Sequence, residues 1–255
     1  MIIISSTTFD QSTNEVIDWL RYLNTEYTRI NQDTKIKINK IELSNDNFIL
    51  SFNADKKTIN SKSISGYWYR RGTLGYLSHP KLKLKNKKLR KEVQTHLDTE
   101  LFELKNFFIK TLEKNNNKVG SFYLKSINKL ETLLLAKELG FKIPETFVIN
   151  SKTDLNQIKG NLITKAIQET KSFNLNLESI KGIYALYTNE ITDITNISQK
   201  FFPSKIQTNI KKKFEIRSFY FNGNIFSMAI FSQKDNQTKT DFRKYNYLKP
   251  NRNVP

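Results

Sequence analysis

The sequence predicts an α/β protein in which strands and helices form α+β layers, not a helical bundle. Apolar patterns with the periods of strands and of helices alternate along the 255 residues. Residues 211–233 carry the pattern of two strands around Asn222 and Gly223, a pair typical of a type I′ hairpin turn. The sequence contains no internal repeat, so a repeat architecture is not indicated.

Residues 1–117 are expected to form an amino-terminal domain. Asp10 to Thr13 is typical of a helix cap, and leucine and phenylalanine recur at three-to-four spacing over 89–112, which predicts a long helix. Alternating or apolar runs predict strands at 2–5, 36–41, 48–52 and 63–71.

The polar residues 115–118 mark the predicted end of this domain, and two further segments follow, at 118–200 and 201–255. A helix over 130–139 is expected to stop at Gly140. Ser151 or Thr153 is expected to cap a short helix reaching 158. Strands are predicted at 146–149, 162–167, 184–188 and 206–210.

Composition excludes several kinds of site. The chain has no cysteine, which excludes disulfides, thiolate metal sites and cysteine nucleophiles. It has 2 histidines, His79 and His96, both expected at the surface, so a histidine metal site or Ser-His triad is nearly excluded. The net charge of +18 fits either a solvated lysine-rich surface or an anionic partner.

The first residues are typical of a strand and lack the basic start of a signal peptide. No apolar run approaches the roughly 18 residues that a membrane span needs. We therefore expect a cytoplasmic protein with no membrane partner.

Three cations and one acid stand out from their surroundings. Lys165 lies within the predicted strand 162–167, with apolar Ile163 and Ile167 on its own face, where an ammonium is costly unless it faces an anion; the alternative is an edge strand in solvent. Lys129 begins a helix, which favours a phosphate contact or an ordinary solvated lysine. Glu215 and Arg217 share one strand face, either in a site or as a structural ion pair. Because no glycine-rich phosphate loop is present, a nucleotide site would need separated lysines.

The order of these features resembles that of ATP-grasp ligases. Residues 128–130 precede a pattern that continues to Lys165, and residues 201–217, 232–233 and 241–243 follow in the family's order. The first of these patterns consists of Ala136, Leu139, Gly140, Pro144 and Thr146. Within that family the sequence is most similar to the microviridin and graspetide peptide maturases, especially the grasp-with-spasm type, and segments 10–13 and 67–72 fit as well.

The resemblance implies a role for each of nine residues. Lys129 and Lys165 would contact the α- and β-phosphates of ATP, and Glu215 would bind the ribose hydroxyls. Arg243 would lie near the transferred phosphoryl group, assisted by Arg217. The hinge whose backbone binds the adenine edge would be formed by Gln207, Thr208, Asn209 and Ile210.

The resemblance also implies the reaction. A side-chain carboxylate of a precursor peptide would take the γ-phosphoryl group of ATP, and a hydroxyl or amine of the same peptide would attack the acyl phosphate, giving an ester or amide crosslink. An acidic precursor with a leader segment would suit the charge of +18. The sequence does not indicate the precursor, its ring pattern or the choice of ester or amide, and the oligomeric state, a homodimer included, is left open.

One departure concerns Mg²⁺. In this family the metal ligands lie on two later strands, an Asp followed by a Glu and an Asn, and this sequence shows no such segment before Pro255. The chain is therefore expected to be a fragment, with an ATP-grasp fold whose amino-terminal domain is present and whose carboxyl-terminal lobe is incomplete, instead of a degenerate relative. By itself it is expected to bind magnesium weakly and to turn over little.

Other functions remain as alternatives. A glutamate-ligase-like enzyme that modifies a protein terminus would share the ATP site, so that only the acceptor would differ. A non-catalytic peptide-binding relative would bind peptide without ATP. A nucleic-acid-binding protein is disfavoured, because the basic residues are dispersed and no binding motif is present.

Overall fold

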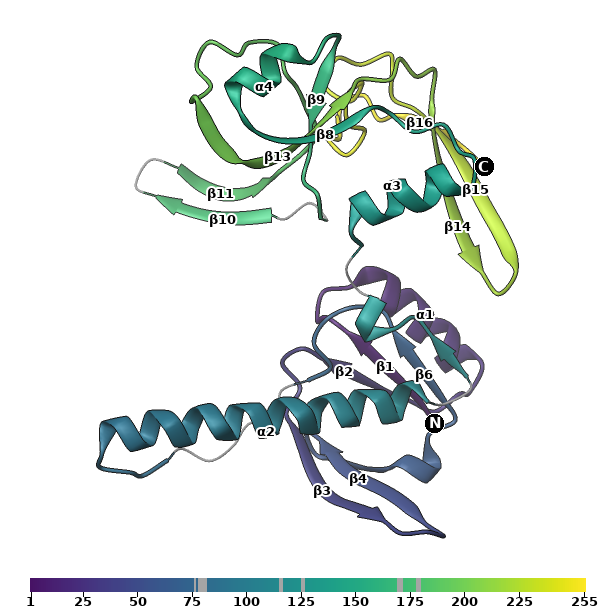
Figure 1. Cartoon of the computed structure of the whole chain (residues 1–255). Helices are drawn as coiled ribbons and strands as arrows, with labels where there is room; N and C mark the ends of the chain where they lie inside the picture. The colour runs from purple at the N-terminus through teal and green to yellow at the C-terminus, as the bar shows by residue number, and fades with distance from the viewer. Residues whose placement is uncertain (76, 78–81, 115–116, 125–126, 169–171, 178–179) are drawn as a thin grey trace. The chain divides into compact units, whose positions relative to one another are not determined.

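The computed structural model describes residues 1–75, 77, 82–114, 117–124, 127–168, 172–177 and 180–255, with the backbone alone for 172–177 and 180–184. The chain forms two compact units, Met1–Lys125 and Ser126–Pro255 (Figure 1). His79 lies outside the described residues, and His96 lies on an exposed helix turn. No helix in these described ranges is long and apolar enough to cross a membrane.

A parallel sheet forms one layer of the first unit. Its order is β2 (Tyr27–Asn31), β1 (Ile2–Ser6), β6 (Gly66–Tyr69) and β7 (Lys118–Val119). Helix α1 (Gln11–Tyr22) connects β1 to β2, as a parallel pair requires. Asp10 caps α1 by accepting a hydrogen bond from the backbone N–H of Thr13, as its position before the helix predicts.

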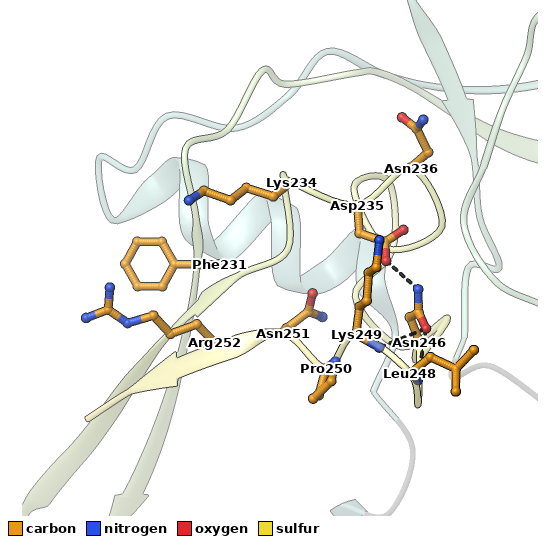
Figure 2. A pocket seen from close by; sticks show the side chains of 10 residues that line it. All are labelled: Phe231, Lys234, Asp235, Asn236, Asn246, Leu248, Lys249, Pro250, Asn251 and Arg252. Carbon is orange, nitrogen blue, oxygen red and sulfur yellow. Dashed lines mark hydrogen bonds between the residues drawn. The ribbon is translucent and has the colours of Figure 1, made fainter.

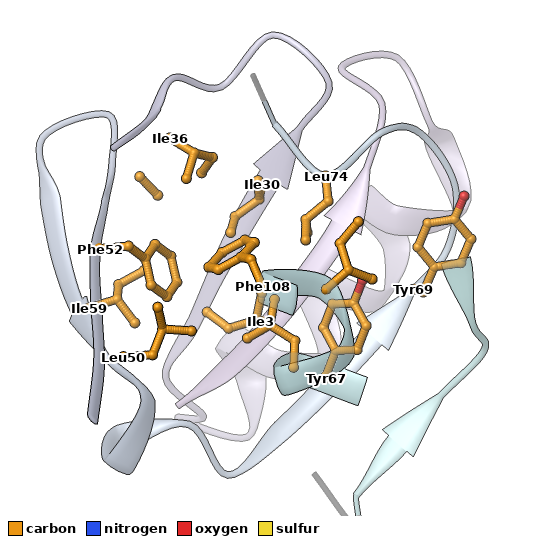
Figure 3. Close-up of a cluster of buried hydrophobic side chains, with 13 residues drawn as sticks. Ile3, Ile30, Ile36, Leu50, Phe52, Ile59, Tyr67, Tyr69, Leu74 and Phe108 are labelled. Carbon is orange, nitrogen blue, oxygen red and sulfur yellow. The ribbon is translucent and has the colours of Figure 1, made fainter. Parts of the chain in front are cut away.

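An antiparallel sheet and a long helix complete the first unit. The sheet consists of β3 (Ile36–Leu43), β4 (Phe48–Ala54) and β5 (Lys57–Asn60), followed by a 3₁₀ turn at Ser61–Ser63. Only the last turns of α2 (Lys87–Glu113) are buried in the core. There Phe108 meets Phe52 edge to face, with ring centroids 4.7 Å apart (Figure 3). A second 3₁₀ turn spans Phe122–Leu124.

The second unit is built on a central antiparallel sheet. Its order is β12 (Asn189–Glu190), β9 (Leu162–Thr164), β13 (Lys200–Thr208) and β8 (Thr146–Ser151). Ser151 caps α4 (Lys152–Gln157), and Leu155 of this helix packs with Leu162 and Ile206 in the core of the unit. The opposite face of the sheet is therefore not part of this core. Helix α3 (Lys129–Glu138) begins the unit, and β10 (Ser172–Leu177) pairs with β11 (Ile180–Ala185).

The predicted hairpin is confirmed. Strands β14 (Glu215–Phe221) and β15 (Asn224–Phe231) flank Asn222 and Gly223, whose φ angles of 46° and 83° are those that a type I′ turn needs. A third strand, β16 (Arg252–Val254), pairs with β15.

Several predicted boundaries were wrong. The strand predicted at 162–167 ends at Thr164, because the chain leaves the sheet at Lys165 toward β10. The strand predicted at 184–188 is also wrong, since β11 ends at Ala185 and the next pairing begins at Asn189. The strand predicted at 63–71 shortens to β6 after the 3₁₀ turn, and β2 and β5 were not predicted, because their alternation of polar and apolar residues is weak.

Candidate functional site

The nine residues singled out in the sequence line one cavity of the second unit, with a volume of about 440 Å³. They come from the start of α3, the segment directly after β9, the end of β13 with the two residues after it, the beginning of β14, and the loop after β15. The structure thus brings together residues that lie up to 114 positions apart in the chain: Lys129, Lys165, Gln207, Thr208, Asn209, Ile210, Glu215, Arg217 and Arg243.

The first turn of α3 is attached to the segment that follows β9. The backbone N–H of Lys129 donates to the carbonyl oxygen of Ile167 at 3.2 Å. Its ammonium donates to the carbonyl of Ala166 at 3.1 Å and to that of Gln168. Lys165 lies in the same segment. Burial, together with the nearby positive charges of Lys129 and Lys212, lowers the pKa of Lys165. This end of the cavity is therefore strongly cationic.

The end of β13 forms a second wall. Gln207 is 1% exposed, and its Nε2 donates to Oγ1 of Thr146 at 2.8 Å. Its Oε1 is buried, and no described residue donates a hydrogen bond to it. An unsatisfied buried acceptor is costly and suits a ligand that brings a donor. The backbone N–H groups of Thr208 and Asn209 already donate to the carbonyls of Glu145 and Asn161, at 3.1 and 2.7 Å.

Glu215 lies where β14 begins and is held by two donors. The ammonium of Lys212 donates to its carboxylate at 2.8 Å, and the hydroxyl of Ser232 does so at 3.0 Å. Arg217 lies two residues further along β14 and places its guanidinium 5.5 Å from the centroid of the Phe242 ring. Both side chains line the cavity, as their shared strand face predicts.

Asp241 holds Arg243 in place. The Nε and Nη2 atoms of Arg243 donate to the two carboxylate oxygens of Asp241, at 2.8 and 2.6 Å. The backbone N–H groups of Arg243 and Thr188 add two further bonds, at 3.1 and 3.0 Å. Burial alone would raise the pKa of Asp241, but these bonds, and those from Arg243 above all, lower it to about 2. The hydrogen bond with Asp241 in turn raises the pKa of Arg243.

The assignment from sequence missed four polar residues of the cavity, which are Thr188, Lys212, Thr240 and Asp241. Asp241 belongs to the segment 241–243 that resembles the ATP-grasp pattern, but the resemblance implied no role for it. Lys212 stands in a run of three lysines, and its spacing of three residues from Glu215 was the available signal.

The described residues do not supply a metal centre. Among them, no group of three or more His, Cys, Asp or Glu side chains could hold a metal ion. Glu215 and Asp241, the two carboxylates of the cavity, already bind basic side chains, at 2.8 and 2.6 Å.

Another cavity, of about 600 Å³, lies beside β15 and the last residues (Figure 2). Phe231, Asp235, Asn246, Lys249 and Arg252 are among its lining residues. Asn246 organises one wall, because its Nδ2 donates to Asp235 at 2.6 Å and its Oδ1 accepts from the N–H of Lys249 at 3.1 Å. None of the nine residues lines this cavity.

Solved structures similar to this chain were found, whereas comparisons with family models and with curated proteins found no match. Among solved structures, a RiPP-associated ATP-grasp ligase of Chryseobacterium gregarium, in complex with ADP and a leader and core peptide, is similar with a TM-score of 0.68 and 22% identity. The similarity covers 95% of this chain and 72% of that one.

Two further structures agree. The macrocyclase MdnC of Microcystis aeruginosa, bound with its precursor peptide MdnA, has a TM-score of 0.65 at 20% identity, over 96% of this chain and 81% of that one. The ATP-grasp ligase PsnB, complexed with a variant minimal precursor, Mg and ADP, has a TM-score of 0.58 at 13% identity, over 95% and 73%. The chain therefore has the fold of these ATP-grasp ligases, which confirms the expected fold class.

Proposed function

We propose that the 440 Å³ cavity binds ATP and that the protein is an ATP-dependent carboxylate ligase acting on a ribosomally made precursor peptide. The observation that carries this proposal is the gathering of separated lysines, a hinge, an acid and two arginines around one cavity. Such a site neutralises phosphates without a glycine-rich loop. The similar structures, which hold ADP and precursor peptides, support the assignment.

The adenine is proposed to lie against residues 207–210. The unsatisfied Oε1 of Gln207 is an acceptor that suits the amino group of adenine. Because the N–H groups of Thr208 and Asn209 are engaged within the chain, the remaining backbone groups of this hinge would complete the contact with the base. Glu215 would accept hydrogen bonds from the ribose hydroxyls, since its carboxylate is fixed at the cavity by Lys212 and Ser232.

The phosphates are proposed to lie against Lys129 and Lys165, with Arg217 and Arg243 nearer the transferred group. Phosphoryl transfer depends mainly on positioning and on neutralising charge. Arg243 is suited to this because Asp241 fixes its guanidinium through two hydrogen bonds, at 2.8 and 2.6 Å. Lys165 is suited because a bound anion would relieve the cost of its burial among positive charges.

The proposed reaction has two steps. An oxygen of a peptide carboxylate attacks the γ-phosphorus, and the bond to the β,γ-bridging oxygen breaks, releasing ADP. A peptide hydroxyl or amine then attacks the acyl carbon and releases phosphate, which leaves an ester or amide crosslink and one proton for solvent. The arginines would stabilise the charge on the transferred group.

The proposed peptide is acidic and carries a leader segment. The net charge of +18 favours an acidic partner over a basic one. Mg²⁺ is the metal that such reactions use, and the PsnB complex described above contains it. Because the described carboxylates do not fit a metal centre, we assign no ligand to it and derive no step through it.

The proposal is tested by trapping the acyl phosphate. The chain is incubated with ATP, Mg²⁺, hydroxylamine and a synthetic peptide rich in Glu, Asp and Thr. The expected result is slow hydroxamate formation that requires both ATP and the peptide, and without hydroxylamine a peptide that has lost one water per crosslink. Hydroxamate formation that does not require ATP, or ATP-dependent extension of the peptide by glutamate in a parallel reaction that contains free glutamate, would contradict the maturase function.

A further inference from the structure

A buried lysine outside the assigned site lies beside its cationic end. Lys205 is 2% exposed, which makes it one of the largest fully buried side chains of the chain. An ammonium in such a position is costly unless an anion or several acceptors surround it. A group that compensates this charge is therefore expected close to the ammonium of Lys205.

The strand geometry shows which way Lys205 points. Side chains two apart on a strand lie on the same face, so Lys205 shares the face of Gln207 on β13. Ile206, between them, lies on the opposite face and packs with Leu155 and Leu162 in the core. Lys205 thus belongs to the face of the sheet that forms the cavity wall with Gln207.

No described residue pairs with the ammonium of Lys205, either by a hydrogen bond or as a salt bridge. The charges close to it have the same sign. Burial first, and then the ammonium groups of Lys165 and Lys129, lowers the pKa of Lys205 to about 8. Repulsion among three ammonium groups disfavours this arrangement unless an anion joins them.

The space for that anion exists beside Lys205. A cavity of about 570 Å³ is lined by Lys205 and Lys165 together with Thr164, Leu186, Phe202 and Ser204. Lys165 also lines the 440 Å³ cavity, so the two cavities meet at this residue. The contact is fixed by the backbone, because the N–H of Lys165 donates to the carbonyl oxygen of Lys205 at 3.4 Å.

We propose that Lys205 is a third phosphate-binding lysine of the nucleotide site, and that it contacts a phosphate oxygen of the nucleotide together with Lys165. This rests on the proposed function, because it requires a nucleotide in the cavity lined by Lys165. The site then holds the ammonium groups of Lys129, Lys165 and Lys205. Lys205 lies on β13, and Lys165 directly follows the neighbouring strand β9. The phosphate chain of the nucleotide is the anion that joins them.

The test compares Lys205→Met and Lys205→Arg with the wild-type chain in titrations with adenosine, ADP and ATP. Lys205→Met should weaken ADP and ATP binding by about tenfold or more while the affinity for adenosine changes less than about twofold. Lys205→Arg should retain most of the ATP affinity, because it keeps the charge. Circular dichroism confirms that both variants are folded.

Two outcomes would overturn the inference about Lys205 without contradicting the proposed function. Equal losses for adenosine and ATP would place Lys205 at the base, and unchanged affinities in Lys205→Met would leave it without a ligand role. In both cases ATP still binds to the wild-type chain and the proposed function stands. A wild-type chain that binds none of the three ligands would instead remove the proposed function, and this inference with it.

Discussion

The two carboxylate oxygens of Asp241 each accept a hydrogen bond from the side chain of Arg243, at 2.8 and 2.6 Å, while one of them also accepts from the N–H of Thr188. Through the bond from Thr188, Asp241 ties the loop after β15 to the residue before β12. It therefore serves both the orientation of Arg243 in the cavity and the stability of the second unit.

Asp241→Asn should destabilise the second unit at neutral pH. A pKa held near 2 means that the carboxylate contributes stability above its ordinary value of 3.8, and that this contribution is lost as the pH falls from about 4 to 2. The loss at pH 7 should be on the order of 2 kcal/mol. Thermal melts at pH 7 and near pH 3 measure this loss. The difference in Tm between wild type and variant should be smaller at the lower pH.

The matched control is Glu138→Gln, a change at an exposed position of α3, which should alter stability by less than about 0.5 kcal/mol. A difference in Tm between wild type and Asp241→Asn that grows as the pH falls would contradict the role assigned to this carboxylate.

Glu215→Gln should weaken ATP binding by about tenfold, because hydrogen bonds to a charged acceptor contribute roughly 1.5–3 kcal/mol. The variant keeps the shape of the side chain and removes its charge. The loss should be smaller for 2′,3′-dideoxy-ATP, which lacks the ribose hydroxyls that Glu215 is proposed to bind. Calorimetric titration with both nucleotides provides the measurement, and equal losses for the two would exclude a ribose contact.

Lys205→Met should stabilise the nucleotide-free chain at pH 7 by about 1 kcal/mol, since it removes an ammonium that is partly desolvated by burial of the side chain and repelled by Lys165 and Lys129. For a chain of this size that corresponds to a rise in Tm of roughly 2–4 °C. Between a folded pKa of about 8 and the ordinary value of 10.5, the unfolded chain binds more protons, so the wild-type chain gains stability as the pH rises.

The advantage of Lys205→Met in Tm should therefore shrink from pH 7 to pH 10. The groups that face Lys205 and depress its pKa are the ammoniums of Lys165 and Lys129, and both are kept in the variant. A variant that melts below wild type at pH 7 would mean that Lys205 contributes packing or contacts that outweigh the cost of its charge.

The site could be predicted where local spacing determines direction. Glu215 and Arg217 are two apart on a strand, so their common face follows from the sequence, and Asn222-Gly223 fixes the turn. Lys205 was missed because local spacing is not enough there. Alternation on β13 places Lys205 and Ile206 on opposite faces, but it does not indicate which of the two faces α4 covers. Only the packing of Leu155 on Ile206 decides that.

Long-range pairing was the other limit. The approach of Lys129 to Lys165 depends on hydrogen bonds between α3 and the segment after β9. In the sequence, β8 and α4 lie between these two segments. Strand β2 was not predicted because its half-buried residues lack a clear alternation, and its place is set by parallel pairing with β1.

The central claim is that the cavity around Lys165 binds ATP, and calorimetric titration of ATP into the wild-type chain and into Lys165→Ala tests it most directly. Lys137→Ala, at an exposed lysine near the end of α3, is the matched control. The account predicts saturable binding to wild type and control, and a Kd raised by about tenfold or more in Lys165→Ala, equivalent to about 1.4 kcal/mol. No binding to the wild-type chain, or equal affinities for all three proteins, would contradict it.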